Sequence, residues 1–216
     1  LRPRTNNAPK CLTLVNETPI IVNCLDALAA AGVRECAVVA GYLAEAVRSA
    51  VGRSHAGMKV RHDLNERYFE TNDMYSLWLA RDLLEGGAYV IEGDVFFRPS
   101  LLPEAEGAMA PKSYYFAGAY DGRKNEVRIE TSPERRVLAI DVCRNGCSGP
   151  TGKNVFFSAG FLAVRPEFGA GFSRWLSEYV ERGEVNVLFD DVLAAHAGDA
   201  ELFVHEITFR DWVEID

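Results

Sequence analysis

The sequence lacks the long apolar run that a membrane-spanning helix requires, because none of its hydrophobic stretches reaches about 18 residues. Its start shows no signal-peptide pattern. Basic residues are outnumbered by acidic ones, 23 to 31, which gives a net charge of -8. Since duplex nucleic-acid binding depends largely on neutralising phosphates, this charge argues against a nucleic-acid partner, but not against a phosphorylated small substrate. We expect no membrane insertion.

Cysteine is scarce, with five residues at irregular spacings. Cys24 and Cys36 lie in apolar stretches that are typical of a protein core. Cys143 and Cys147 form the only close pair, and no further metal ligands stand near them. We therefore expect free thiols and a cytoplasmic location. The four histidines show no metal spacing either, and the chain has no internal repeat or low-complexity tract.

What the chain does contain is material for a core: 48% of its 216 residues are hydrophobic, which suits one large domain. A helix is predicted after Thr18, with Thr18 as its cap, Pro19 in its first turn and Gly32 at its exit. Strands and helices then alternate. We expect strands at 35–40, 59–62 and 88–91, and helices at 43–51 and 73–84. This alternation predicts a parallel sheet, with ligands bound at the carboxyl ends of its strands.

The pattern changes after residue 110, where strands follow one another with little helix between them. They are predicted at 114–120, 126–130, 137–142 and 155–164, before helices at 167–182 and 190–197 and short strands from 203 onward. The expected fold is therefore α/β: a Rossmann-like mixed, mainly parallel sheet flanked by helices, with a small antiparallel extension at 111–165. We interpret residues 1–216 as a single domain.

Two segments carry charges that suit a nucleotide. Arg2, Arg4 and Lys10 lie in an irregular basic stretch that favours a polyphosphate or, equally, a solvated terminus. The predicted strand 88–91 runs directly into Glu92-Gly93-Asp94. Asp94 would stand where ligands bind, as a Mg²⁺ ligand beside phosphates or as a simple turn residue.

Two further segments leave a choice between structure and function. Thr71, Asn72 or Asp73 could cap the helix that follows them, or Thr71, Asn72 and Ser76 could line a pocket for a nucleobase. The final stretch 211–216 alternates three carboxylates with apolar residues, and none of them is unusual alone.

The order of these motifs resembles a known superfamily. Residues 1–5, 8–12 and 15–20 (LRPRT, APKCL and VNETPI) are similar to the opening of the sugar-1-phosphate nucleotidyltransferases. Residues 70–77 (ETNDMYSL) and 92–95 (EGDV) resemble, more narrowly, the phosphocholine cytidylyltransferase branch, which includes the phosphonate cytidylyltransferases. Residues 212–216 (WVEID) look like the closing motif of that family.

The resemblance implies a role for each matching residue. Lys10 would contact the phosphates, Asp94 and Asp216 would hold Mg²⁺, and Lys153 would bind the acceptor's phosphate. The remaining nucleotide-binding candidates are Arg2, Thr71, Asn72, Ser76, Glu92 and Gly93. The family's loop G-x-G-x-R and the strand ahead of it would directly precede Leu1, and we expect the natural protein to have both.

The implied reaction joins CMP from CTP to a small phosphonate or phosphorylated alcohol and releases pyrophosphate. Hydroxyethylphosphonate, aminoethylphosphonate and phosphocholine all stay open as acceptors. A quaternary ammonium would need an aromatic cage, but aromatic residues at strand spacing are more often core. A sugar-1-phosphate acceptor, a non-catalytic nucleotide-binding module and a related glycosyltransferase are the alternatives. A homodimer and a fusion to another catalytic domain are both compatible with the sequence.

Overall fold

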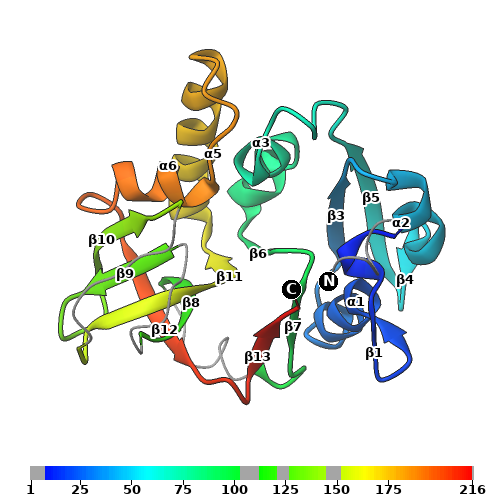
Figure 1. The fold of residues 1–216 in the computed structure, drawn as a ribbon, viewed down its shortest axis with the longest axis horizontal. Coiled ribbons are helices and arrows are strands. Elements are labelled where there is room, and N and C mark those ends of the chain that lie inside the picture. Colours follow the sequence, from blue (N-terminus) through cyan, green and yellow to red (C-terminus); the bar gives the residue numbers. More distant parts are fainter. Residues whose placement is uncertain (1–7, 103–111, 121–126, 145–151, 216) are drawn as a thin grey trace.

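The computed structural model describes residues 8–102, 112–120, 127–144 and 152–215. The first half of the chain alternates short strands and helices (Figure 1). Its elements are η1 (Lys10–Leu12), β1 (Leu14–Val15), β2 (Thr18–Pro19), α1 (Ile20–Ala30), β3 (Glu35–Ala40), α2 (Ala44–Val51), β4 (Ser54–His55), β5 (Met58–Leu64), α3 (Asp73–Leu79), η2 (Arg81–Gly86), β6 (Ala88–Ile91) and β7 (Val95–Phe97).

The second half consists mostly of strands. Its elements are β8 (Ser113–Ala119), β9 (Val127–Thr131), β10 (Val137–Val142), β11 (Val155–Val164), α5 (Pro166–Glu181), α6 (Phe189–Ala195), β12 (Leu202–Ile207) and β13 (Trp212–Glu214). The described residues contain no helix that is both long and apolar enough to cross a membrane.

The strands form separate sheets in the two halves. In the first half, β5 pairs with β3 in parallel and with β4 antiparallel. In the second half the strand order is β10-β9-β11-β8-β12, and β6 joins this sheet by pairing with β11. Among the described strands of this sheet, β8 and β12 are the one parallel pair. The sheets and their flanking helices confirm the mixed α/β class expected from the sequence.

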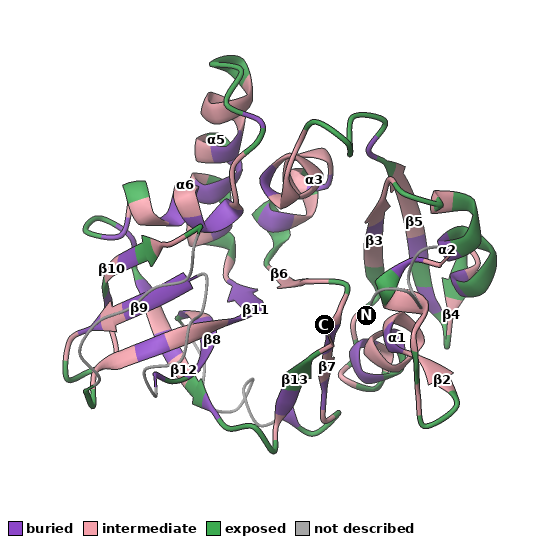
Figure 2. Cartoon of the chain, in the orientation of Figure 1, coloured by how far each residue is buried: buried purple, intermediate pink, exposed green. Residues whose placement is uncertain are grey.

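Strand β11 connects two hydrophobic clusters, because successive side chains of a strand point to opposite faces of its sheet. Phe161 belongs to the cluster under α1 and β3. The next residue, Leu162, belongs to the cluster under α5 and α6. Neither side chain is exposed to solvent. Figure 2 shows buried segments in β11 and in the neighbouring strands β8 and β9.

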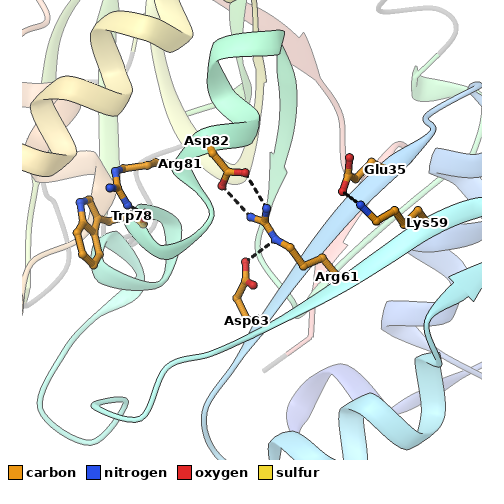
Figure 3. A network of polar contacts seen from close by, with 7 residues as sticks. All are labelled: Glu35, Lys59, Arg61, Asp63, Trp78, Arg81 and Asp82. Carbon is orange, nitrogen blue, oxygen red and sulfur yellow. Dashed lines mark hydrogen bonds and ion pairs between the residues drawn. The ribbon is translucent and has the colours of Figure 1, made fainter.

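An ion-pair bridge connects the three-stranded sheet to the rest of the molecule. Arg61 of β5 reaches Asp82 of η2 with both terminal nitrogens, Nη1 at 2.6 Å and Nη2 at 2.8 Å (Figure 3). Its Nε also donates to Asp63 at 2.9 Å. At the start of η2, the Arg81 guanidinium lies 4.3 Å from the ring centroid of Trp78 in α3. Arg61 therefore ties β5 to the segment that leads into β6.

Three local expectations were wrong. Thr18 does not cap α1: it pairs with Val15 in β2, and Pro19 takes the N-cap position. The helix predicted at 73–84 ends at Leu79, where Ala80 leaves helical geometry (φ -107°, ψ 13°) and a 3-10 helix follows. Cys143 is disulfide-bonded rather than free. Gly32, by contrast, ends α1 with φ 86°, as its position predicted.

Candidate active site

A pocket of about 940 Å³ lies between β3 and β6, beside α3. Four of the sequence-predicted site residues line it: Ser76, Glu92, Gly93 and Asp94. The walls are otherwise mainly apolar, with Cys36, Ala37 and Val39 from β3 and Tyr89, Val90 and Ile91 from β6. The pocket therefore combines an apolar body with a small polar group, as small-molecule sites do.

Lys10 and Asp94 form an ion pair at this pocket, although 84 residues separate them in the sequence. The distance from Lys10 Nζ to Asp94 Oδ2 is 3.3 Å, and the two side chains are 45% and 19% exposed. Lys10 begins the short helix η1, directly after Pro9. The pair thus joins the predicted phosphate-binding lysine to the predicted metal ligand.

Two other charged residues of the predicted nucleotide and metal site, Arg2 and Asp216, lie outside the described residues. The neighbourhood of Asp216 is nevertheless defined. Its neighbour Ile215 donates its main-chain N–H to the C=O of Asp94 at 3.1 Å. One residue earlier, Glu214 pairs with Val95 where β13 runs antiparallel to β7.

Glu92 lies in a negatively charged environment. Burial raises the pKa of its carboxyl group to about 9, and the nearby carboxylates of Asp73, Asp190, Asp94 and Glu214 add to the increase. Its carboxyl group packs on Gly160: a Cβ at Gly160 would lie only 2.7 Å from Glu92 Cδ. Gly160 sits at a register shift in β11 with φ 62°. This part of the site would attract a cation.

The donor chemistry of this end of the pocket fits a hard cation such as Mg²⁺. Carboxylate oxygens are its preferred protein ligands, and it commonly uses only one or two of them beside substrate phosphates and water. Asp94 supplies such a group with part of its surface accessible. Within the described ranges, no cluster of three or more His, Cys, Asp or Glu residues has metal-site geometry. The described site would therefore rely on few protein ligands.

The predicted base-binding residues do not all face the main pocket. Asn72 is a helix cap, since its Oδ1 accepts the N–H of Asp73 at 2.9 Å. It lines a second pocket of about 210 Å³ with Val142, Arg144 and Leu188. Thr71 Oγ1 donates to the C=O of Arg67 at 2.9 Å. Of the three candidates, only Ser76 lines the pocket that contains Asp94.

Lys153 lies away from this group. It is exposed just ahead of β11, where its C=O accepts a hydrogen bond from Arg135 Nη1 at 2.6 Å. Several aromatic residues that were candidate cage walls, Tyr115, Phe116 and Phe156 among them, are fully buried. For these residues the core interpretation is confirmed.

Sequence reasoning missed a buried polar group next to the site. Tyr115 donates its hydroxyl hydrogen to Asp190 Oδ1 and lies 2.8 Å from Ser158 Oγ. Burial raises the pKa of Asp190 to about 7 against the lowering effect of the Tyr115 bond. Neither residue carries a motif, but the two consecutive aspartates at 190–191 inside an apolar stretch were a usable signal.

No protein-family model matches the chain. The chain is 39% identical over 114 residues to the CMP-5'-(3-aminopropyl)phosphonate synthase of Streptomyces rubellomurinus, a match that covers 50% of this chain and 18% of that relative. It is 26% identical over its whole length to the 2-aminoethylphosphonate cytidylyltransferase of Lancefieldella rimae, of which it covers 83%. The chain thus spans less than a fifth of the first relative.

The fold has a solved counterpart. The CTP:phosphocholine cytidylyltransferase of Streptococcus pneumoniae superposes with a TM-score of 0.79 and 23% identity, covering 100% of this chain and 87% of that one. The fold is that of the nucleotidyltransferases. The sequence relatives, more narrowly, are cytidylyltransferases, so the resemblance drawn from the motifs is confirmed. The sequence likenesses support the transferase activity proposed below.

Proposed function

We propose that this chain transfers a cytidylyl group from CTP to a small phosphonate or phosphorylated alcohol. The single observation that carries the proposal is the Lys10–Asp94 ion pair, in which Lys10 is joined to a carboxylate that lines the same pocket as Ser76. Its cytidylyltransferase relatives support the choice of nucleotide, and their names support a phosphonate acceptor.

In this reaction an oxygen of the acceptor's phosphonate or phosphate attacks the α-phosphorus of CTP. The new O–P bond forms as the bond to the β-phosphate oxygen breaks, and pyrophosphate leaves with that electron pair. The attacking oxygen is already ionised, so no strong general base is required. The contribution of the protein is positioning and charge neutralisation. Lys10 neutralises the phosphates, with Arg2 as a second basic contact.

A bound Mg²⁺ supplies further charge neutralisation to the phosphate oxygens. We propose that Asp94 and Asp216 hold it. The hydrogen bond between Ile215 and Asp94 supports this pairing, because it brings the residue before Asp216 against Asp94. We also propose Ser76, Glu92 and Gly93 as the nucleotide contacts in the main pocket, with Thr71 and Asn72 as flanking residues and Lys153 as the acceptor contact.

We further propose that residues 1–216 form one catalytic domain, with 111–165 contacting the acceptor, and that a strand and the G-x-G-x-R loop precede it. The unpaired edges of β3 and β6 support the preceding strand. Among the described residues, β3 pairs only with β5 and β6 only with β11, and both strands line the same pocket. An inserted strand would satisfy both edges.

Hydrogen–deuterium exchange tests this. A protein that includes the preceding segment should exchange the backbone amides of 35–40 and 88–91 more slowly than residues 1–216 alone, and equal exchange rates in the two proteins would contradict the inserted strand.

The direct test is pyrophosphate release with Mg²⁺, each of the four nucleoside triphosphates and a panel of acceptors. The panel contains aminoethylphosphonate, hydroxyethylphosphonate, phosphocholine and sugar 1-phosphates. We expect release with CTP and one phosphonate or phosphorylated alcohol. Release with sugar 1-phosphates alone would replace this function by sugar activation. Nucleotide binding without release from any acceptor would contradict the catalytic proposal.

We also propose a cytoplasmic setting: the free thiols of Cys11, Cys24 and Cys36 support it, whereas the disulfide of Cys143 counts against it.

A further inference from the structure

Asn65 is a buried polar residue at the carboxyl end of the parallel strands. It directly follows β5 and is only 3% exposed. Its main-chain N–H donates to the C=O of Ala40, the last residue of β3, at 3.0 Å. Asn65 therefore stands where two neighbouring strands end, on the side of the sheet at which ligands of such folds bind.

The orientation of the Asn65 amide is fixed by an unambiguous donor. The main-chain N–H of Arg67 lies 2.9 Å from Asn65 Oδ1, and a backbone N–H can only donate. The oxygen must therefore face Arg67, which leaves Nδ2 to face the opposite side. There it donates to Thr71 Oγ1 at 3.0 Å and to Ser76 Oγ at 3.1 Å.

These two hydrogen bonds determine what each hydroxyl group can still do, because a hydroxyl has one hydrogen to donate. Thr71 already donates its hydrogen to the C=O of Arg67. Ser76 accepts from Asn65, and no acceptor for its own hydrogen is found among the described residues. Since Ser76 lines the main pocket, its hydroxyl is available there as a hydrogen-bond donor.

We propose that Asn65 is a positioning residue: it occupies one lone pair of the Ser76 hydroxyl and so orients the hydroxyl hydrogen toward N3 of the nucleobase, which selects cytosine over uracil. The inference rests on the proposed cytidylyl transfer. On the base edge of cytosine only O2 and N3 accept hydrogen bonds, and of these only N3 becomes a donor, N3–H, in uracil. A hydrogen-bond donor at Ser76 therefore forms a hydrogen bond with N3 of cytosine. With uracil, the same donor faces the N3–H group, which is also a donor, and no hydrogen bond forms.

The variant Asn65→Asp reverses the polarity with almost no change in shape. Its carboxylate still accepts the Arg67 N–H, but it accepts from Ser76 instead of donating to it. Ser76 then offers a lone pair to the pocket. We expect the ratio of kcat/KM for CTP over UTP to fall at least about tenfold, with UTP turnover rising. A merely structural role would lower turnover of both nucleotides together and leave the ratio unchanged.

A second variant keeps the test valid if Asn65→Asp folds poorly. Ser76→Ala removes the donor at a helical position where alanine is favourable, and the CTP-to-UTP ratio should again fall about tenfold. The matched control is Ser177→Ala. Ser177 also accepts from a side-chain N–H, that of Trp78 at 3.3 Å, but it lies on α5 outside the pocket. This control should keep the ratio.

Binding measurements distinguish failure of this inference from failure of the proposed function. Titration calorimetry gives dissociation constants for CTP and UTP without turnover. If no acceptor yields pyrophosphate but the binding ratio shifts in Asn65→Asp and Ser76→Ala, the function is wrong and the role of Asn65 holds. If transfer to the acceptor occurs and neither variant shifts the ratio, the role of Asn65 is wrong.

Discussion

The main-chain N–H of Ile215 donates a hydrogen bond to the C=O of Asp94 across 3.1 Å, although 121 positions separate them. β13 continues this contact by pairing antiparallel with β7, Glu214 opposite Val95. Main-chain hydrogen bonds hold the end of the described chain beside the strand end that carries the Asp94 carboxylate. The position of Asp94 therefore depends on backbone pairing, and changing its side chain should leave that pairing intact.

We expect Asp94→Asn to lower kcat by about 10²–10³-fold while leaving the fold intact, because it removes one charge without changing size. Pyrophosphate release measured over a range of Mg²⁺ concentrations checks this, and the variant should need more Mg²⁺. Asp26→Asn is the control, since Asp26 pairs with His55 away from the pocket. Equal losses in both variants would remove Asp94 from the site.

Lys10→Ala should reduce kcat/KM by about 10²-fold, because a preorganised positive charge near the reacting phosphates is lost. The Lys10 side chain is 45% exposed, so the free energy of unfolding should change by no more than about 0.5 kcal/mol. Lys59→Ala is the matched control: Lys59 is also exposed and also ion-paired, with Glu35 at 2.7 Å. Steady-state kinetics would contradict the role of Lys10 if both variants behaved alike.

The buried carboxyl group of Asp190 should make stability depend on pH. Its pKa is about 7 in the folded protein, chiefly through burial, against an ordinary value of 3.8. The folded state therefore holds this proton more tightly, and the free energy of unfolding should fall as pH rises from about 4 to 7. Urea unfolding across pH 4–8 measures the slope. Asp190→Asn should make the slope shallower, with the remainder due to the raised pKa of Glu92, and an identical slope in this variant would contradict the role of Asp190.

The bridge from Arg61 to Asp82 should contribute only modestly to stability. The Asp82 side chain is 59% exposed, and exposed pairs typically couple by about 0.2–1 kcal/mol. A double-mutant cycle with Arg61→Met and Asp82→Asn should give a coupling energy in that range, reduced by 1 M salt. A cycle on Arg182 and Glu184, another two-bond pair, provides the comparison. A coupling energy that does not change with salt would show that solvent does not screen the Arg61–Asp82 ion pair.

The sequence predicted the elements well wherever local signals decide them. Periodicity located β3, β10 and β11, and Gly32 marked the end of α1. The start of α1 was misassigned because Thr18, a good cap locally, is drawn into a hairpin with Val15. A pairing partner several residues away outweighs local propensity there.

The candidate site was predictable only where a motif marks it. The motifs marked Lys10, Asp94 and Ser76: Asp94 and Ser76 line one pocket, and Lys10 forms an ion pair with Asp94. Asn65 and Asp190 were missed because their roles come from tertiary contacts, to Ser76 in one case and to Tyr115 in the other. No spacing in the sequence reveals such contacts.

Strand β11 supplies Phe161 to one hydrophobic cluster and Leu162 to the other. A substitution in this strand is consequently felt in both halves of the protein, unlike a substitution in α1 or α5. These adjacent residues should therefore couple the unfolding of the two hydrophobic clusters. β11 is therefore a segment in which sequence change should be poorly tolerated, even though it supplies none of the charged side chains that line the pocket.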